Sequence, residues 1–484
     1  MVGESMSDLR SLHDDIAAAV PGPATLAAFD LDGTLISGYS ASVVYRDRLR
    51  RFDISVAELL RTTNAAVETR FRGADVGNLM RIGVESLAGR MEDEMQEWGQ
   101  RLFRQEIARM IFSEVRGLLA AHRHAGHRVV MATSATPYQA LSVAADLDID
   151  AEDVLCTRPA ILDGMLTGKL ESPPLWGQAK ADALREYADK HGADLGDSFA
   201  YSNGAEDVPM LKSVGHPVAL NPDRKLAATA RQNGWPSVNL RPPESGADPM
   251  SIARTTTAIG VLMGAAAFGV SAGLLTQNRQ TGANLVGSFG PDLALAICGI
   301  NVRIKGKENA WSARPAVFMF NHQSSLDLLV IGSVIRRDVT GVAKKEAARD
   351  PRFIPVGALL DVAYIDRADS TKARAALLPA VDKLQSGISI AIAPEGTRSP
   401  TPRLGRFKKG GFHLAMQAGV PIVPIVIHNA GERMWRNSLV AHPGTVDVDV
   451  LEPVPTDDWD LADLDRHVDE VRTLFEDCLH AGHR

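Results

Sequence analysis

The stretch Thr255–Leu275 constrains the architecture of this 484-residue chain most strongly, because it carries no charge and is rich in Gly, Ala and Leu. As an α-helix it would be about 31 Å long, enough to cross a hydrocarbon core. It follows a proline-rich linker, residues 241–249. We therefore expect two folded domains, residues 1–244 and 301–484, on either side of a linker and membrane-associated hydrophobic helices in residues 245–300.

A second apolar stretch, Leu285–Ile300, is a poor membrane span because Pro291 and Asp292 interrupt it and a charge at mid-membrane is costly. A single span would place the two domains on opposite sides of the membrane, although neither domain has secretory features. We therefore expect a helix pair that enters one leaflet, with both domains facing the cytoplasm. A two-span hairpin is the second possibility, and a helix buried in a globular core is the third.

Charge and cysteine content exclude some classes of protein. The net charge of −7 provides no overall basic field to neutralise phosphates, so we expect no nucleic acid as a partner. The acidic N-terminal segment does not resemble a signal peptide. Cys156, Cys298 and Cys478 are odd in number and lack the spacing of metal ligands, and we expect reduced thiols in a cytosolic compartment.

Two aspartates in the N-terminal half follow residues 25–29, an apolar segment that we predict to be a strand. Asp30 and Asp32 can share one site at the carboxyl end of a parallel strand. In that position Asp30 could attack phosphorus and form an aspartyl phosphate, while Asp32 could protonate the leaving group and later activate water. A solvated Asp-rich turn is the alternative for this pair taken alone.

Later segments of the same half add further polar groups at predicted strand ends. Residues 128–132 lead into two hydroxyls suited to a phosphoryl oxygen, and residues 199–201 lead into an oxygen-rich loop fit for Mg²⁺. A lysine between them can neutralise charge on the same group. These candidate phosphate-binding residues are Thr133, Ser134 and Lys180, and the candidate metal ligands are Asp30, Asp32, Asn203 and Asp207.

In order and spacing, these segments resemble the haloacid-dehalogenase superfamily of phosphatases, in particular its phosphoserine-phosphatase-like branch, over about residues 25–220. The resemblance implies a Rossmann-like α/β domain, a Mg²⁺ cofactor and a helical cap at about residues 40–112. The family normally has a Mg²⁺-binding aspartate at the position of Asn203. We expect a working phosphatase with a weakened Mg²⁺ site, and an inactive regulatory or tethering domain is the alternative.

The C-terminal half contains a histidine and an aspartate, His322 and Asp327, directly after the apolar residues 315–320. At the end of a strand the two side chains can turn toward one another. The carboxylate then fixes the imidazole tautomer, and the other ring nitrogen can take a proton from an alcohol. For this pair alone, a strand-end histidine with an ordinary hydrogen bond is the alternative.

Two further segments of this half end in groups that suit a phosphate. Residues 390–394 form a predicted strand that leads into a short polar turn, and an arginine follows the apolar residues 363–365. Glycine lets a backbone approach phosphate closely, threonine adds a hydroxyl donor, and arginine offers a planar fork of donors. The candidate substrate-binding residues are Arg367, Glu395, Gly396, Thr397 and Arg398.

Together with a fourth apolar strand at residues 420–427, these segments resemble the glycerolipid acyltransferase family, in particular the 1-acylglycerol-3-phosphate acyltransferases, over about residues 302–455. The resemblance implies an α/β domain at a lipid bilayer that moves a fatty acyl group from acyl-CoA or acyl carrier protein to lysophosphatidate. It also implies that Lys344 and Lys345 help to bind the anionic acceptor, although a solvated lysine pair is equally compatible. Glycerol 3-phosphate is the alternative acceptor.

Overall fold

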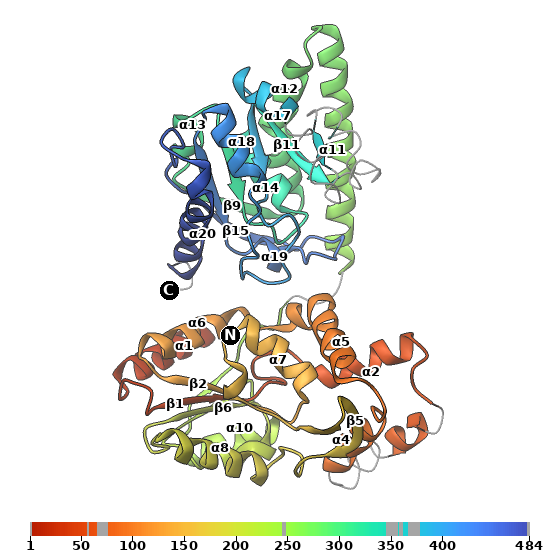
Figure 1. Ribbon diagram of the computed structural model, residues 1–484, viewed down its shortest axis with the longest axis vertical. Helices are drawn as coiled ribbons and strands as arrows, with labels where there is room; N and C mark the ends of the chain where they lie inside the picture. The colour runs from red at the N-terminus through yellow and green to blue at the C-terminus, as the bar shows by residue number, and fades with distance from the viewer. Residues whose placement is uncertain are drawn as a thin grey trace. The chain divides into compact units, whose positions relative to one another are not determined.

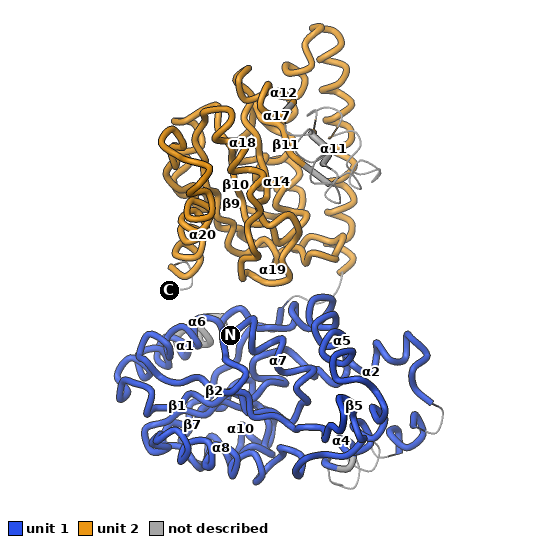
Figure 2. The backbone as a smooth tube through the Cα atoms, viewed as in Figure 1, with its two compact units in different colours: residues 1–243 blue, residues 244–484 orange. Residues whose placement is uncertain are grey.

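The computed structural model describes residues 2–55, 58–64, 76–243, 248–344, 357, 362–365 and 378–481. The chain divides into two compact units, residues 1–243 and 244–484 (Figure 2). The N-terminal unit contains a parallel sheet and the C-terminal unit a mixed sheet, each covered by helices (Figure 1). The predicted α/β class is therefore confirmed for both halves.

The N-terminal unit is built on a six-stranded sheet with the order β3-β2-β1-β6-β7-β8, in which every neighbouring pair is parallel. All residues of β1 and β6 are buried, as expected for central strands covered on both faces. The strands are β1 (Leu26–Phe29), β2 (Arg128–Ala132), β3 (Val154–Leu155), β6 (Phe199–Ser202), β7 (His216–Leu220) and β8 (Ser237–Val238).

Helices lie on both faces of this sheet (Figure 1). Apolar residues of α8 and α10 pack with alternate residues of β1, Leu26 and Ala28, while α1 and α6 lie on the opposite face. The helices are α1 (Val2–Ala18), α6 (Ser113–His124), α7 (Pro137–Asp146), α8 (Gln178–His191), the short α9 (Val208–Leu211) and α10 (Arg224–Asn233).

The segment at residues 40–112 is helical in its described parts, which comprise α2 (Ser40–Arg50), α4 (Val76–Glu85) and α5 (Glu92–Gln105). A hairpin of β4 (Pro159–Leu162) and β5 (Met165–Leu170) packs against α4. Leu166 of this hairpin joins a small apolar cluster with residues of the helical segment. The sequence did not predict the hairpin, because only one residue of β5 is buried and the strand lacks a regular apolar alternation.

The hydrophobic segment forms two packed helices, α11 (Pro249–Leu275) and α12 (Arg279–Ile297). Among the described residues, α11 is the one helix that is long and apolar enough to cross a membrane. The second helix begins earlier than its apolar stretch and continues through Pro291. The charge of Asp292 is matched by Arg336, whose Nη2 atom lies 2.6 Å from the carboxylate.

The C-terminal unit contains a seven-stranded sheet with the order β12-β11-β13-β10-β14-β15-β9. Neighbouring strands are parallel except β14 and β15, which are antiparallel. The strands are β9 (Ile300–Lys305), β10 (Val317–Phe320), β11 (Val339–Lys344), β12 (Ala363–Ile365), β13 (Ser389–Ile392), β14 (Ile422–Ile427) and β15 (Gly444–Val450).

Strand β10 lies at the centre of this unit and is buried on both faces. Val317 and Met319 face a cluster formed by α17, α18 and α20, whereas Phe318 and Phe320 face a cluster that includes α14 and α12. Residues that follow β10 are therefore held at the end of a rigid strand. The helices are α13 (Asn309–Ser312), α14 (Asp327–Ile335), α17 (Leu378–Gln385), α18 (Gly410–Ala418), α19 (Ala430–Arg433) and α20 (Leu464–Ala481).

Candidate active sites

The first candidate site is a buried group of charges at the carboxyl end of β1. Asp30 directly follows the strand, and Lys180 of α8 places its Nζ atom 2.8 Å from Asp30 Oδ1 and 2.7 Å from Asp207 Oδ2. All three side chains are buried. Because an unpaired buried charge is strongly destabilising, the lysine is the group that permits two carboxylates to lie here together.

Burial and mutual attraction shift the pKa values of Asp30 and Lys180. Burial raises the pKa of Asp30, and the nearby Lys180 offsets only part of that rise. Burial alone would lower the pKa of Lys180, but attraction to Asp30 and Asp207 outweighs it and leaves that pKa raised. Lys180 is therefore protonated at neutral pH, and it favours the ionised form of the carboxylate beside it.

The side chains around Asp30 fit a hard divalent cation. Thr34 Oγ1 lies 3.3 Å from Asp30 Oδ2 and 3.4 Å from Asn203 Oδ1, so the carboxylate and the amide oxygen border the same space. Asp207 Oδ1 is buried and has no hydrogen-bond partner among the described residues. A buried carboxylate oxygen without a hydrogen-bond partner suits a ligand of Mg²⁺. The structure thus brings Asp30, Asn203 and Asp207 together as candidate ligands.

Close approach of the backbone shapes this cradle. A Cβ atom on Gly33 would lie 2.0 Å from Asn203 Nδ2, and the φ angle of Gly33 is +83°. Any side chain at residue 33 would therefore displace the Asn203 amide. The need for glycine at residue 33 is therefore steric. The sequence did not reveal it, because the loop with Asn203 lies about 170 residues further along the chain.

Asp32 contacts the beginning of the helical segment instead of the buried charges. Its Oδ1 atom accepts a hydrogen bond from the Ser40 backbone N–H at 2.6 Å, and its Oδ2 atom accepts one from Ser40 Oγ at 3.1 Å. Burial raises the pKa of Asp32, and the bonds from Ser40 lower it to a smaller extent. A carboxyl group with a raised pKa suits proton transfer. Because Ser40 engages both oxygens, this arrangement favours the acid–base role of Asp32 over a role as a side-chain metal ligand.

The predicted hydroxyls lie at the same edge of the sheet. Thr133 and Ser134 follow β2, which pairs in parallel with β1. Thr133 is buried, and its Oγ1 atom accepts a hydrogen bond from the Ala135 backbone N–H at 3.1 Å. Ser134 is half-buried. Their positions match the prediction that strand ends gather these residues near Asp30.

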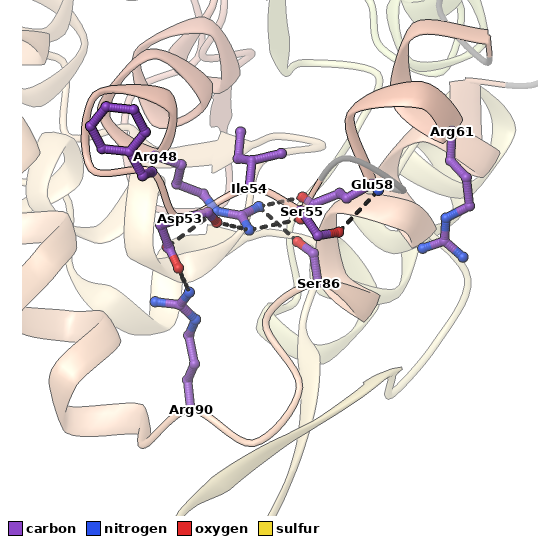
Figure 3. Close-up of a pocket in the computed structure, with 9 residues that line it drawn as sticks. Arg48, Asp53, Ile54, Ser55, Glu58, Arg61, Ser86 and Arg90 are labelled. Carbon is purple, nitrogen blue, oxygen red and sulfur yellow. Dashed lines mark hydrogen bonds and ion pairs between the residues drawn. The ribbon is translucent and has the colours of Figure 1, made fainter.

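An open pocket lies among the helices of residues 40–112 (Figure 3). Arg48 is buried there and donates to both carboxylate oxygens of Glu58, at 2.6 and 3.0 Å. Arg90 contacts Asp53 at 2.5 and 2.6 Å. Arg48 is therefore part of the interior, and Glu58 already neutralises its charge.

The second candidate site is the histidine–aspartate pair after β10. Asp327 is fully buried at the first position of α14, and its Oδ2 atom accepts a hydrogen bond from His322 Nδ1 at 2.8 Å. The same oxygen accepts bonds from the backbone N–H groups of Gln323 and Ser324, at 2.7 and 2.8 Å. The carboxylate therefore holds the proton on Nδ1 and leaves Nε2 as the basic nitrogen. The predicted pair is brought together.

Two residues that flank this pair position the histidine. Glu395 is buried; its Oε1 atom accepts from the His322 backbone N–H at 2.9 Å, and its Oε2 atom accepts from Gly405 N at 2.8 Å. The amide of Asn321 bonds both backbone groups of Ile427, at 2.7 and 2.8 Å. Glu395 was predicted among the substrate-binding residues, and its contacts point to a positioning role. Asn321 was not predicted, because nothing in the sequence shows where its amide points.

Positive charge lies beside the histidine segment. Arg398 Nη1 donates to Ser325 Oγ at 2.5 Å. Gly396 is buried with a φ of +72°, and a Cβ atom there would lie 3.1 Å from Nζ of Lys408. Thr397, between them in sequence, is exposed. Lys344 is the last residue of β11, while Lys345 and Arg367 lie outside the described residues.

Comparisons with known proteins assign these two sites to two families. Residues 27–212 match the haloacid dehalogenase-like hydrolases, and residues 301–428 match the acyltransferases. The chain is 34% identical to a phosphoserine phosphatase of Mycobacterium tuberculosis, an alignment that covers 51% of this chain and 78% of that protein. It is 31% identical to a 1-acyl-sn-glycerol-3-phosphate acyltransferase of Limnanthes douglasii, covering 42% and 71%. A Cocos nucifera protein of the same name is 32% identical, covering 40% and 63%.

Replacing Lys180 with Met tests the buried charges of the first site. We expect the free energy of unfolding of the N-terminal unit to fall by about 3–5 kcal/mol at neutral pH, because two buried carboxylates lose their counter-charge. A carboxyl whose pKa is raised in the folded state destabilises that state as the pH rises, so the loss should shrink as the pH falls below the raised pKa of Asp30. Denaturant unfolding followed by circular dichroism measures both effects. Lys190→Met, an exposed change on the same helix, is the control, and equal stabilities of the two variants would contradict the prediction.

Proposed function

The chain belongs to the haloacid dehalogenase-like hydrolases and to the acyltransferases, and on this premise we propose that it is a membrane-bound enzyme with two activities. Its C-terminal domain transfers a fatty acyl group from an acyl thioester to 1-acylglycerol 3-phosphate and so forms phosphatidate. Its N-terminal domain hydrolyses a phosphomonoester with the aid of Mg²⁺. The hydrogen bond between His322 and Asp327 is the single observation that carries the acyltransferase proposal.

The acyl transfer follows from the tautomer of His322. Nε2 takes the proton of the acceptor hydroxyl as the oxygen attacks the thioester carbonyl, and Asp327 stabilises the imidazolium that forms. When the tetrahedral intermediate collapses, the carbon–sulfur bond breaks and the proton on Nε2 passes to the departing thiolate. The products are an ester and a thiol, and no enzyme nucleophile takes part. Acyl-CoA and acyl carrier protein both supply such a thioester.

The anionic end of the acceptor is held by positive groups near His322. Arg398 and Lys408 lie on the segment that follows β13, and the Gly396 backbone is close to the lysine. Arg367, Lys344 and Lys345 are the remaining predicted contacts to phosphate. Binding of the phosphate fixes the acceptor hydroxyl near Nε2, which lowers the entropic cost of the reaction. Assays with lysophosphatidate and glycerol 3-phosphate separate the two acceptors, and activity on glycerol 3-phosphate alone would reject our choice.

The phosphatase proposal rests on the buried group around Asp30. Asp30 attacks phosphorus, Lys180 neutralises charge on the site, and Asp32 gives a proton to the leaving oxygen. Asp32 then removes a proton from the water that hydrolyses the aspartyl phosphate. Asp30, Asn203 and Asp207 would hold Mg²⁺, which adds positive charge beside the phosphoryl oxygens when it is bound. Phosphoserine is the first substrate to test, followed by lysophosphatidate, phosphatidate and sugar phosphates.

Membrane attachment is proposed from the surface of the helix pair. Large apolar side chains of α11 are exposed along its second half, and only 17% of its most apolar 18-residue window is buried. Exposed apolar surface of this extent is unfavourable in water and suits a lipid leaflet. We place the pair in one leaflet with both catalytic domains facing the cytoplasm. The exposed apolar residues of the pair include Ile259, Met263, Phe268, Val270, Leu274, Leu275, Leu285, Phe289 and Leu293.

The His322→Ala variant tests the proposed base. We expect the rate of acyl transfer to fall by about 10²–10⁴-fold, which is the usual contribution of general acid–base catalysis. Transfer of a radiolabelled acyl group to lysophosphatidate measures it. His480→Ala removes an exposed histidine and should retain full activity. Phosphate release by the same protein serves as an internal control for folding, and substantial residual transfer would remove His322 from its role.

The Asn203→Asp variant tests the metal site. An added carboxylate increases the charge at the candidate ligands, so half-maximal phosphate release should require less Mg²⁺, by about tenfold. Phosphate release is measured across a Mg²⁺ titration, with Asp30→Asn as the inactive control. If neither wild type nor Asn203→Asp releases phosphate from any tested substrate at high Mg²⁺, the domain is a regulatory or tethering module.

Charged substitutions on α11 test membrane attachment. The double variant Phe268→Asp, Leu274→Asp should weaken binding to phospholipid vesicles by at least about tenfold, because each buried apolar side chain contributes about 1.5–3 kcal/mol. Leu461→Asp, an exposed leucine outside the helix pair, is the matched control. Vesicle flotation reports the bound fraction. Release of the wild-type protein by high salt without detergent would count against the insertion of the helix pair.

A further inference from the structure

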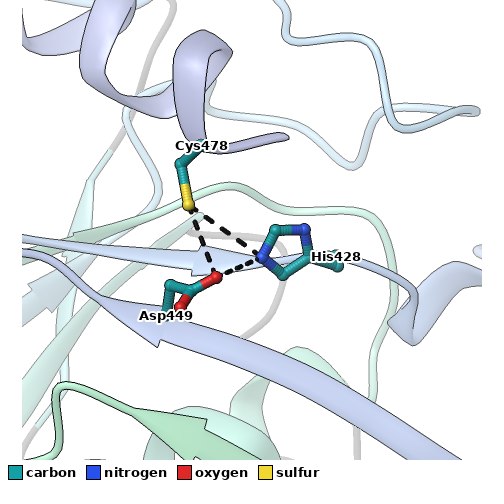
Figure 4. A group of neighbouring side chains, drawn as sticks. All are labelled: His428, Asp449 and Cys478. Atoms are coloured by element: carbon teal, nitrogen blue, oxygen red, sulfur yellow. Dashed lines mark hydrogen bonds and ion pairs between the residues drawn. The ribbon is translucent and has the colours of Figure 1, made fainter. Parts of the chain in front are cut away.

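Three metal-ligating side chains meet in the C-terminal unit outside the histidine–aspartate pair (Figure 4). His428 Nε2 lies 2.7 Å from Asp449 Oδ2, and Cys478 Sγ lies 3.5 Å from the same oxygen and 4.0 Å from His428 Nε2. None of them has a part in either proposed reaction. Each is partly buried, with 12% of the His428 side chain and 21% of the Asp449 side chain exposed.

The pleat of the sheet brings two of these groups to one face. Val426 pairs directly with Asp449 across the antiparallel strands β14 and β15, and His428 lies two residues beyond Val426 on the same face. Residues of the opposite parity, such as Ile427 and Val448, face the other core cluster. Helix α20 covers the face that carries His428 and Asp449, and it supplies Cys478 from its last turns.

The spacing of the three ligand atoms approaches that of a tetrahedral zinc site. Zn²⁺ bonds of about 2.0–2.1 Å to nitrogen and oxygen and about 2.3 Å to sulfur place the ligand atoms about 3.3–3.6 Å apart. The cysteine-to-aspartate distance already falls in this range. The histidine–aspartate distance must lengthen by about 0.6 Å and the histidine–cysteine distance must shorten by about 0.4 Å. Side-chain rotations of that size leave the strands and the helix in place.

We propose that His428, Asp449 and Cys478 bind one Zn²⁺ ion, which fastens α20 to strands β14 and β15. Nitrogen, oxygen and sulfur together form a borderline ligand set that favours zinc over Mg²⁺ or Ca²⁺. Binding displaces the proton of the Cys478 thiol to solvent and shifts the His428 proton to Nδ1, so no oxidant or reductant is required. Water completes the fourth position.

Neighbouring charges are compatible with this site. Lys305, on β9, places its Nζ atom 3.9 Å from Asp449 Oδ1, but its side chain is 90% exposed and can turn into solvent. Burial and the Asp449 carboxylate raise the pKa of the Cys478 thiol to about 12, so without metal the thiol donates a hydrogen bond to Asp449. A thiolate bound to zinc, a carboxylate and a neutral imidazole together balance the charge of the ion.

The spacing in sequence explains why these ligands were missed. His428 and Asp449 are 21 residues apart, and Asp449 and Cys478 are 29 residues apart. No short motif contains all three ligands. The sequence analysis compared only the spacing of the three cysteines with one another, so it did not consider Cys478 together with a histidine and an aspartate. Ile427 precedes His428 and is bonded by the Asn321 amide, next to His322. The zinc site is therefore one strand away from the proposed acyl-transfer site.

Cobalt substitution tests the proposal on the full-length protein in detergent. Co²⁺ bound by a thiolate gives a charge-transfer absorption band that Co²⁺ bound by oxygen ligands at the phosphatase site does not give. We expect one equivalent of Co²⁺ to produce this band, and Zn²⁺ to displace it. The band should be absent in Cys478→Ala, and Asp449→Asn should weaken binding by at least about tenfold, since loss of even an outer-shell partner has that effect.

Matched variants keep the test decisive. Cys156→Ser, a buried cysteine in the other unit, should leave the band unchanged. Asp449→Asn preserves the size of the side chain, so it tests metal binding even if the Cys478→Ala variant does not fold. At the same concentration, added Zn²⁺ should raise the melting temperature of the C-terminal unit more in wild type than in Asp449→Asn. Absence of the band in wild type, or its persistence in Cys478→Ala, would show that the three residues form only a hydrogen-bonded cluster.

Discussion

Burial of parallel strands on both faces leaves only their carboxyl ends for chemistry, and both halves of the chain depend on this constraint. β1 and β10 contribute no exposed residue along their lengths. Asp30, the first residue after β1, and His322, the second residue after β10, are therefore each anchored by a fully buried strand. Neighbouring parallel strands end at the same edge, so Asp207, after β6, lies near the first residue and Glu395, after β13, lies near the second. Lys180 reaches Asp30 from helix α8.

The two sites stabilise their buried charges in different ways. At the first, a protonated lysine lies between two carboxylates, so that opposite charges compensate one another. At the second, no lysine or arginine among the described residues pairs with Asp327, and backbone N–H groups with the imidazole satisfy its Oδ2 atom. At the first site, the lysine that pairs with the carboxylates can also neutralise charge on a phosphate. At the second, the carboxylate held by N–H donors keeps His322 in one tautomer.

Positioning residues connect each site to elements that are distant in sequence. Ser40 joins Asp32 to the first turn of α2, so proton transfer and the helical segment share a contact. Asn321 joins the end of β10 to the backbone of β14 beside His428. A metal ion bound by His428, Asp449 and Cys478 would stiffen the same end of this strand. Rigidity around the proposed base thus has several independent sources.

The sequence by itself determined the local features. Apolar runs that end in Asp30 or His322 predicted buried strands with reactive ends, and the uncharged stretch around Phe268 predicted a long apolar helix, since both patterns depend only on neighbouring residues. The α/β class and the two families followed from the order of these segments. The identity of residue 203 as an asparagine also came from the sequence alone, as did its expected effect on metal binding.

Only the tertiary structure decided which side chains meet. The β4–β5 hairpin, the bond from Ser40 to Asp32 and the placement of Glu395 behind His322 join residues that no periodic pattern relates. The cluster of His428 and Cys478 arises because strand pleating and helix packing select one face for both. The direction of a side chain is set by packing against elements that are distant in sequence. A pattern of neighbouring residues does not show which distant elements will pack together.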